Sequence, residues 1–278
     1  MDYTVEDPVT GLERPFIIAN EPTQSSDDEL EPGTGFYYDG DTKIIYGGCT
    51  GRVELLESGY ARKCPYPDSP DRDGCLQDIA SEYRIYKILG SHPRLLRVIY
   101  FDPHVGLTME YVPNGNLKRY LRKNEATITD EQRRQWVQDA LESVDLLHTH
   151  DVIHSDLKAE NFLVDAQLRL RITDFSGSST PDRVGTAVES ARHFLPRKWE
   201  DPPTIATDLF ALGSTIYEIV TGVQPYAALH DEEVERLYAQ KKFPATDHLM
   251  FHSLMQACWN ISIDSANDLK TMFDVSIQ

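Results

Sequence analysis

The fold is decided by residues 154–174, which read HSDLKAENFLVDAQLRLRITD. Asp156 and Asn161 lie on a predicted loop that follows a run with helical periodicity. The later run LRLRIT alternates apolar and polar residues as a half-buried strand does, and Asp174 comes directly after it. The pattern therefore predicts a hairpin that brings the oxygen atoms of these three side chains together.

Three converging oxygen ligands suit the transfer of a phosphoryl group. The transfer needs a divalent metal on the triphosphate, and Mg²⁺ prefers oxygens such as the Asn161 amide and the Asp174 carboxylate. Asp156 would orient an attacking hydroxyl and accept its proton, and Lys158 would place positive charge beside the migrating group. We therefore expect a phosphotransferase site in this stretch.

This stretch resembles the catalytic loop and the Asp-Phe-Gly segment of the protein kinases. The resemblance implies an α+β, bilobal fold, with a small β-rich N-terminal lobe that holds one main helix and a larger, mainly helical C-terminal lobe. It also implies ATP and Mg²⁺, or Mn²⁺, as cofactors. Lys158 favours the serine/threonine type, because tyrosine kinases usually carry Ala or Arg near this point. The chain also resembles kinase-domain proteins of filamentous fungi.

The segment upstream, residues 43–65, resembles the opening hairpin of the small lobe. Gly48, Gly51 and Val53 take the second Gly, third Gly and Val positions of the GxGxxGxV loop, whereas Tyr46 replaces the first Gly. Glycine at these positions lets backbone amides approach phosphate closely. Two glycines near a strand would also suit a plain hairpin turn.

The third predicted strand carries Lys63, in ARK where the family has VAIK, and Ala61 would then cover the adenine. A helix is predicted from about Cys75 to Leu89, with Gly90 as its C-cap. Glu82 on this helix would form an ion pair with Lys63, which the family uses to assemble its ATP site.

Residues 105–121 read as a strand that ends in MEYV and breaks at the turn signal PNGN. This resembles the hinge between the lobes. The resemblance places Met109 at the back of the adenine pocket, and the backbone of Glu110 and Val112 at the adenine edge. It also places Leu163 among the nucleotide-binding residues.

The C-terminal part contains the helices that the family requires. A capping box is predicted at Thr129–Gln132, and an apolar stripe from Trp136 to Leu147 leads up to the catalytic loop. The run TDLFALGSTIYEIVTG, residues 207–222, resembles the central hydrophobic helix, whose Asp208 binds the backbone of the catalytic loop. Three further short helices are predicted after it.

Two residues depart from the family pattern beside the predicted site. Ser155 stands where the family has the Arg that receives an activation-loop phosphate, so we expect activity that does not depend on phosphorylation of residues 175–196. Ser176 replaces the Gly of the Asp-Phe-Gly segment, although Gly177 follows it. We expect less inward and outward movement of this segment.

A third departure lies in SARHFLPR, residues 190–197, which aligns with the family's TxxYxAPE. Ser190 takes the position of the substrate-loop Thr, and Arg197 stands where the family has a buried Glu. An unpaired buried charge is costly, so we expect Arg197 to pair with Asp264 or Asp268, or else to be exposed.

Length and composition agree with two domain-sized units in 278 residues, of which 40% are hydrophobic. Residues 1–36 are acidic and lack periodicity, which predicts a mobile tail. The kinase resemblance divides the rest into an N-lobe over residues 37–112 and a C-lobe over residues 113–278.

The net charge of −18 disfavours nucleic acid and anionic membranes as partners, because both would be repelled. Protein substrates, basic ones in particular, suit the charge better. The resemblance places Glu160 where basic-directed kinases meet a substrate Arg, although an exposed Glu in a loop is commonly inert. The sequence does not indicate an oligomeric state.

The four cysteines show neither metal-ligand spacing nor the density of a secreted disulfide protein. The N-terminus lacks the pattern of a secretory signal, and no run approaches the length of a transmembrane span. We therefore expect a cytoplasmic or nuclear protein.

Two other functions remain open. Tyr46, Ser155 and Ser176 also suit a pseudokinase that binds nucleotide and acts as a scaffold. The spacing of the acidic residues occurs in aminoglycoside-type phosphotransferases as well, although Lys158 and the Asp208 helix favour a protein kinase.

Overall fold

A six-stranded sheet forms the first part of the molecule, with its strands in the order β3-β4-β5-β6-β8-β7. All neighbouring strands in it are antiparallel. The structure is a computed structural model, and it describes residues 4–6, 13–15, 37–39, 42–48 and 50–276. The strands are β3 (Tyr37–Asp39), β4 (Thr42–Gly47), β5 (Arg52–Leu55), β6 (Ala61–Cys64), β7 (Val98–Asp102) and β8 (Gly106–Met109).

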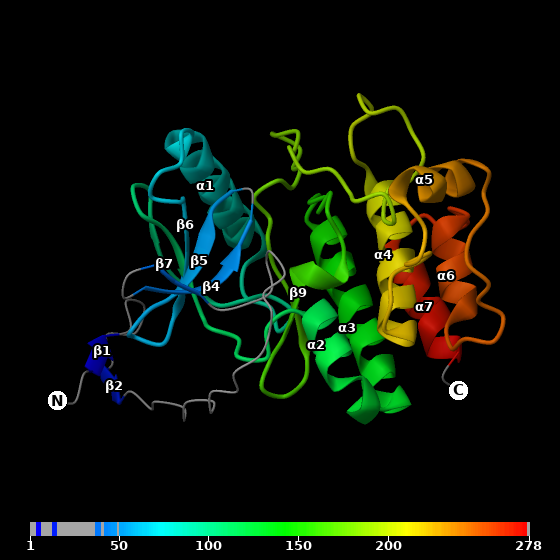
Figure 1. The fold of residues 1–278 in the computed structure, drawn as a ribbon, viewed down its shortest axis with the longest axis horizontal. Helices are drawn as coiled ribbons and strands as arrows, with labels where there is room; N and C mark the ends of the chain where they lie inside the picture. The colour runs from blue at the N-terminus through cyan, green and yellow to red at the C-terminus, as the bar shows by residue number, and fades with distance from the viewer. Residues whose placement is uncertain (1–3, 7–12, 16–36, 40–41, 49, 277–278) are drawn as a thin grey trace.

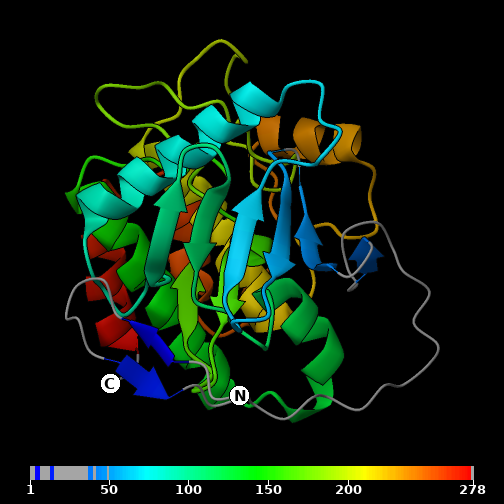
Figure 2. The same cartoon turned by 90° about the vertical axis from the view of Figure 1, so that its left-hand side faces the viewer.

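Helix α1 (Arg72–Leu89) packs against β6, β7 and β8 and is drawn in cyan in Figure 2. It begins earlier than Cys75, because the side chain of Asp71 caps it by accepting a hydrogen bond from the Gly74 N–H. It ends at Gly90, as predicted, in a positive-φ conformation (φ 69°) that glycine adopts without strain.

Strands β1 (Thr4–Glu6) and β2 (Glu13–Pro15) pair antiparallel within the first 36 residues. The other residues of the predicted tail lie outside the described part of the chain, as does Cys49 in the predicted nucleotide loop. The mobility of the tail therefore stays a prediction.

The hairpin predicted in residues 154–174 is present. Strand β9 (Phe162–Val164) follows a single 3₁₀ turn, η2 (Ala159–Asn161), and pairs antiparallel with β10 (Leu170–Ile172). The side chains of Phe162, Val164, Leu170 and Ile172 are fully buried, so the alternating pattern fixes the register of the hairpin. The loop before β9 and the residues after β10 consequently lie at the same end of the hairpin.

Helices make up most of the chain that follows, and they lie on the side of the molecule opposite the sheet (Figure 1). A hydrophobic core runs continuously from α1 to the last helix. Among the described residues, none of the helices is long and apolar enough to cross a membrane. The helices are α2 (Leu117–Asn124), η1 (Glu125–Thr127), α3 (Asp130–Thr149), α4 (Ile205–Thr221), α5 (Asp231–Ala239), α6 (His252–Trp259) and α7 (Ala266–Ser276).

Helix α4 is the predicted central helix, and it packs between α3 and α6. Every residue from Thr207 to Ile216 is buried, which agrees with a sequence that is apolar on all sides. Thr204 and Thr207 form a reciprocal capping box at its start. This cap fixes the first turn of the helix, which carries Asp208.

The capping box predicted for α3 is only half formed. The Thr129 hydroxyl accepts a hydrogen bond from the Gln132 N–H at 3.1 Å. The Gln132 side chain does not return this bond, because it donates instead to the carbonyl of Leu168 at 3.0 Å. Helix α3 is therefore bonded to the turn of the β9–β10 hairpin.

Candidate active site

The site is centred on the ammonium group of Lys63. Its Nζ lies 2.7 Å from Glu82 Oε2 and 2.6 Å from Asp174 Oδ1. Lys63 comes from β6, Glu82 from α1, and Asp174 from the residues after β10, so one cation joins three segments of the chain. The Glu82 side chain is fully buried, whereas that of Asp174 is 32% exposed. The predicted pairing of Lys63 and Glu82 is confirmed.

Burial and the two ion pairs have opposite effects on the pKa values of Asp174 and Lys63. Burial by itself would raise the pKa of Asp174, but attraction to Lys63 outweighs it and lowers the pKa to about 2. The two carboxylates likewise raise the pKa of Lys63 above its ordinary value despite the burial of the ammonium group. Because its folded pKa is depressed, Asp174 stabilises the fold above about pH 4, and this contribution is lost as the pH falls toward 2.

Asp174 is held in an unusual backbone conformation, with φ at 67°. Residues other than glycine rarely adopt positive φ, and such strain persists only where the surroundings enforce it. The Ser176 hydroxyl donates a hydrogen bond to Asp174 Oδ1 at 2.9 Å and lies 3.4 Å from Lys63 Nζ. It also lies 3.3 Å from the hydroxyl of Thr50 in the glycine loop. The serine that replaces the family's glycine thus ties Asp174 to its neighbours.

The catalytic loop places Asp156, Lys158 and Asn161 side by side. Lys158 Nζ lies 2.7 Å from Asp156 Oδ2. The Asn161 amide donates hydrogen bonds to the backbone carbonyl of Asp156 at 2.7 Å and to its Oδ2 at 3.2 Å. Burial raises the pKa of Asp156, and Lys158 partly opposes this. The loop therefore presents one carboxylate fixed by an amide and an ammonium group.

The hairpin brings this loop to Asp174. The Thr173 N–H donates to the carbonyl of Asn161 at 3.0 Å, and His154 Nε2 lies 3.1 Å from the carbonyl of Thr173. Thr173 directly precedes Asp174 in the sequence. The three oxygen-bearing residues predicted from the sequence consequently lie around one place, as expected.

Asp208 at the start of α4 fixes the backbone of the catalytic loop. Its carboxylate accepts hydrogen bonds from the N–H groups of His154 at 2.8 Å and Ser155 at 3.0 Å. It also lies 3.0 Å from His148 Nε2, a contact that the sequence did not indicate. Ser155 itself has φ at 69°, so the bond to Asp208 helps to hold a strained loop. The predicted role of Asp208 in the fold is confirmed.

The predicted hinge lies beside the β6 strand. Met109 pairs in register with Ala61, and both side chains are buried, as is that of Val112. The Val112 carbonyl accepts a hydrogen bond from the Gly115 N–H at 3.2 Å. The Glu110 N–H donates a hydrogen bond to the backbone carbonyl of Arg97 at 2.9 Å. Among the described residues, no backbone group bonds to the Val112 N–H or the Glu110 carbonyl. These are two of the groups expected to meet an adenine edge.

The glycine loop is held close to β6. Gly51 has φ at 150°, and a Cβ atom at this position would lie 2.2 Å from the carbonyl of Cys64, so only glycine fits. Gly48 donates its N–H to the carbonyl of Gly51 at 2.9 Å. Tyr46 on β4 is 37% exposed, and its ring lies against the loop, because Cε1 is only 3.2 Å from where a Cβ atom on Gly48 would stand. Tyr46 thus replaces an open glycine position with a bulky side chain.

The site residues fit a hard divalent cation. Among the described residues, none donates a hydrogen bond to Asn161 Oδ1 or Asp174 Oδ2, whereas the other polar atoms of these two side chains are engaged. No group of three or more His, Cys, Asp or Glu side chains in the described part of the chain could hold a metal alone. Two free oxygens suit Mg²⁺, which usually keeps several waters and binds substrate phosphates.

The prediction for Arg197 is wrong. Its guanidinium pairs with Glu189, with Nη2 lying 2.9 Å from Oε2, and not with Asp264 or Asp268. It also lies over the ring of Phe194, at 4.4 Å from the centroid. Glu189 is nearly fully buried and lies only eight residues before Arg197, so the nearer carboxylate satisfies the charge.

The sequence also missed the partner of Glu160. Lys118 Nζ on α2 lies 2.5 Å from Glu160 Oε1, and the Glu160 side chain is only 23% exposed. Nearby on α4, burial raises the pKa of Glu218 to about 8, with repulsion from Glu160 adding to the shift and Lys118 opposing it. Lys118 and Glu218 were not predicted, because no local spacing connects them with Glu160.

Comparison with known families identifies the chain. The sequence model of the protein tyrosine and serine/threonine kinase family matches residues 68–274. The chain belongs to this family. The match agrees with the sheet-rich first part, the helical second part and the geometry described above, so the bilobal kinase fold and a protein kinase domain are confirmed.

The relatives of this kinase domain are distant. It is 25% identical over 193 residues to the probable serine/threonine-protein kinase PknB of Lactococcus lactis, covering 66% of this chain and 30% of that protein. It is 29% identical over 211 residues to the probable serine/threonine-protein kinase drkC of Dictyostelium discoideum, covering 68% and 27%. It is 26% identical over 254 residues to the fibroblast growth factor receptor homolog 1 of Drosophila melanogaster, covering 78% and 35%. The chain thus spans about a third or less of the length of these relatives.

The role of Ser176 can be tested by removing its hydroxyl. We expect Ser176→Ala to lower the free energy of unfolding by about 1–2 kcal/mol, because a hydrogen bond to a charged group is lost at a strained residue. Urea unfolding of the two proteins at pH 7 measures this. Ser262→Ala is the matched control, since it removes only a 3.3 Å bond to a backbone carbonyl in the C-terminal part. Equal losses in both variants would contradict the assignment.

Proposed function

We propose that this kinase domain transfers the γ-phosphoryl group of ATP to serine or threonine hydroxyls of protein substrates. The observation that carries the proposal is the arrangement around Lys63, which bonds to Glu82 and Asp174 at once while Asp156 and Asn161 lie beside them. An ammonium group held between two carboxylates is placed to neutralise phosphate charge without moving.

Each residue of the site has a proposed task in the transfer. Asp156 orients the substrate hydroxyl and accepts its proton as the hydroxyl oxygen forms a bond to the γ-phosphorus. The bond from that phosphorus to the bridging oxygen breaks at the same time, and ADP leaves with the electron pair. Lys158, bonded to Asp156, places positive charge beside the migrating phosphoryl, and Lys63 holds the phosphates that stay on ADP.

Asn161 and Asp174 would hold Mg²⁺ through the oxygen atoms that other groups leave free. The metal supplies charge neutralisation on the triphosphate when it is bound. Asp174 is suited to this task, since its low pKa keeps the carboxylate ionised at neutral pH. Asp156 fixes the amide nitrogen of Asn161, which leaves the amide oxygen to face the metal.

Nucleotide binding would use the hinge and the glycine loop. The apolar surfaces of Ala61, Met109 and Leu163 would enclose the adenine, and the backbone of Glu110 and Val112 would bond its edge. The loop residues Gly48, Gly51 and Val53 would cover the phosphates. Tyr46 would have to move aside when the triphosphate enters, because its ring lies against Gly48 in this loop.

The proposed activity predicts phosphorylation of generic protein acceptors. With labelled ATP and either Mg²⁺ or Mn²⁺, casein or a basic protein should gain label on Ser and Thr. Asp156→Ala should reduce the rate at least about 100-fold, because proton transfer and hydroxyl positioning are both lost. Phosphoamino acid analysis identifies the acceptor. Asp247→Ala, which removes an exposed carboxylate in the helical part, is the control and should retain the wild-type rate.

Two outcomes would contradict the proposal. Label that enters sugars or aminoglycosides, and no protein, would indicate a small-molecule phosphotransferase. Binding of ATP without transfer to any acceptor, equal in wild type and Asp156→Ala, would indicate a pseudokinase that acts as a scaffold. Lys158 and the Asp208 helix favour the protein kinase over the first alternative.

A basic protein substrate is favoured by an acidic cluster formed by Glu160, in the catalytic loop, and Glu218, on α4. One oxygen of each carboxylate, Oε2, is buried and lacks a hydrogen-bond partner among the described residues. Lys118 already pairs with the other oxygen of Glu160. We propose that a basic substrate side chain approaches Glu160, whose side chain is 23% exposed, and that the negative charge of Glu218 adds to this attraction once Glu218 is ionised.

This cluster predicts a pH-dependent preference for basic peptides. Glu218, with a pKa of about 8, is protonated at neutral pH and gains charge as the pH rises through 8. The KM for a basic peptide should therefore fall between pH 6.5 and 8.5, while that for an acidic peptide should not. Steady-state kinetics of both peptides measures this.

The matched variants are Glu218→Gln and Glu160→Gln. The first should abolish the pH dependence of the KM, and the second should reduce the preference for basic peptides. If both variants keep the wild-type preference for basic peptides, Glu160 and Glu218 take no part in substrate recognition.

A further inference from the structure

The catalytic loop lacks the cation that the kinase resemblance places directly before Asp156 and that would receive a phosphate from the segment after Phe175. Ser155 occupies that position and is fully buried. Its hydroxyl donates only to the carbonyl of Ile153, at 3.3 Å, and its N–H is bonded to Asp208. Ser155 carries no positive charge with which it could pair with a phosphate on that segment.

Arg183 provides a cation from within the segment. Its Nη1 donates to the carbonyls of Ser176 and Ser178, both at 3.3 Å, and its Nη2 lies 3.0 Å from Asp78 Oδ1 on α1. One guanidinium thus ties the start of the segment to the helix. A guanidinium suits this task because its donors are fixed in one plane.

The backbone around Arg183 forms a turn that is held by hydrogen bonds. Thr180 and Arg183 exchange two backbone hydrogen bonds, of 2.9 and 3.0 Å. Ser179 exchanges two more with Ile153 beside the catalytic loop, and its hydroxyl accepts from the Gly185 N–H at 2.8 Å. The turn at residues 180–183 consequently has little freedom to move Arg183 away from α1.

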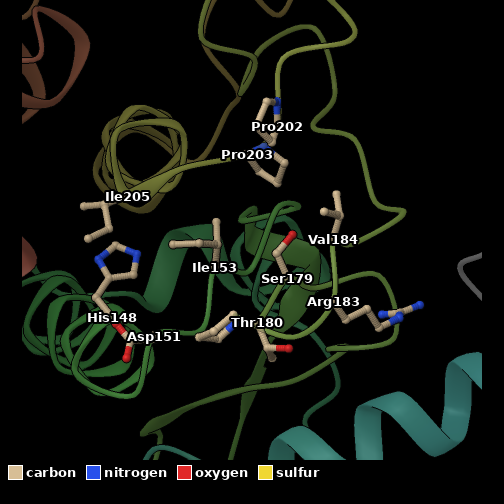
Figure 3. Close-up of a pocket in the computed structure, with 11 residues that line it drawn as sticks. His148, Asp151, Ile153, Ser179, Thr180, Arg183, Val184, Pro202, Pro203 and Ile205 are labelled. Carbon is tan, nitrogen blue, oxygen red and sulfur yellow. The ribbon is translucent and has the colours of Figure 1, made fainter.

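A pocket of about 270 Å³ is lined in part by this turn, through Thr180, Pro181 and Arg183, and Figure 3 shows how its lining residues are arranged. Its wall includes His148, Ile153 and Pro203. In Figure 3 the Arg183 side chain extends away from these residues, on the side of α1. Arg183 thus lines the pocket, while its guanidinium is directed toward Asp78 on α1.

Asp78 is four residues before Glu82 on α1, so the two carboxylates lie one turn apart on neighbouring parts of the helix surface. Glu82 pairs with Lys63, and Asp78 pairs with Arg183. A movement of α1 away from the cleft would stretch both ion pairs together. The position of α1 is thus coupled to the segment that follows Asp174.

We propose that Arg183 is a positioning residue, which holds α1 and the segment after Phe175 in the geometry that forms the Lys63–Glu82 pair. The pair Arg183–Asp78 connects the segment to the helix without a phosphate, since the cation is on the segment and the carboxylate is on the helix. The proposal rests on the proposed function only in its effect on turnover.

The test uses the full chain, treated with phosphatase, and the variants Asp78→Asn and Arg183→Gln. Each should lower kcat about fivefold, the effect of about 1 kcal/mol for a partly exposed ion pair, with little change in the KM for peptide. Hydrogen exchange of the α1 amides should be faster in both variants. The double variant should lose no more than either single one, because both break the same contact.

The reversed pair, Asp78→Arg with Arg183→Asp, should regain part of the activity and of the exchange protection. Lys270→Gln breaks an ion pair of similar exposure between α7 and α3, and it should change neither readout. Additive losses in the double variant, together with no recovery in the reversed pair, would overturn the proposal. Hydrogen exchange does not depend on phosphoryl transfer. An inactive wild type would therefore refute the proposed function, and the exchange rates of the α1 amides would still decide whether Arg183 positions the helix.

Discussion

The site depends on one buried ammonium group between two carboxylates. Lys63, Glu82 and Asp174 come from a strand, a helix and the end of a hairpin, and the Lys63 ammonium group pairs with both carboxylates at once. Removing one partner of a buried ion pair commonly costs about 3–5 kcal/mol, because the remaining charge stays buried. The triad therefore both stabilises the junction of the sheet with the helical part and sets the charge that a triphosphate would meet.

Around this triad, polar side chains hold the backbone of the catalytic loop and of Asp174 in place by hydrogen bonds. Asp208 holds two N–H groups of the catalytic loop, and the Ser176 hydroxyl holds Asp174 in a positive-φ conformation. These contacts oppose the strain of the two residues with positive φ at the site, Ser155 and Asp174. Where the family has glycine and arginine, this chain has Ser176 and Ser155; Ser176 is hydrogen-bonded to Asp174, and Arg183 pairs with Asp78 on α1.

The parts that the sequence predicted are those in which local pattern and chemistry agree. The alternation in LRLRIT predicted the β9–β10 hairpin, which is present, and the spacing of Asp156, Asn161 and Asp174 predicted that the hairpin brings their side chains together. The parts that it missed depend on the direction of long side chains. Arg197 turned to Glu189 rather than to the C-terminal helices, and Lys118 paired with Glu160 across 42 positions. The Gln132 side chain donates to the carbonyl of Leu168 instead of completing the capping box, and Leu168 is brought near it only by the tertiary fold.

The most direct test of the central claim is calorimetric titration of ADP with Mg²⁺ into the wild-type chain and into Lys63→Met. We expect the wild type to bind at millimolar nucleotide or below and the variant to bind at least about tenfold more weakly, since the charge that faces the phosphates is removed. Absence of nucleotide binding in the folded wild type, or equal affinity in both proteins, would contradict the claim that Lys63 and its two carboxylates form a nucleotide site.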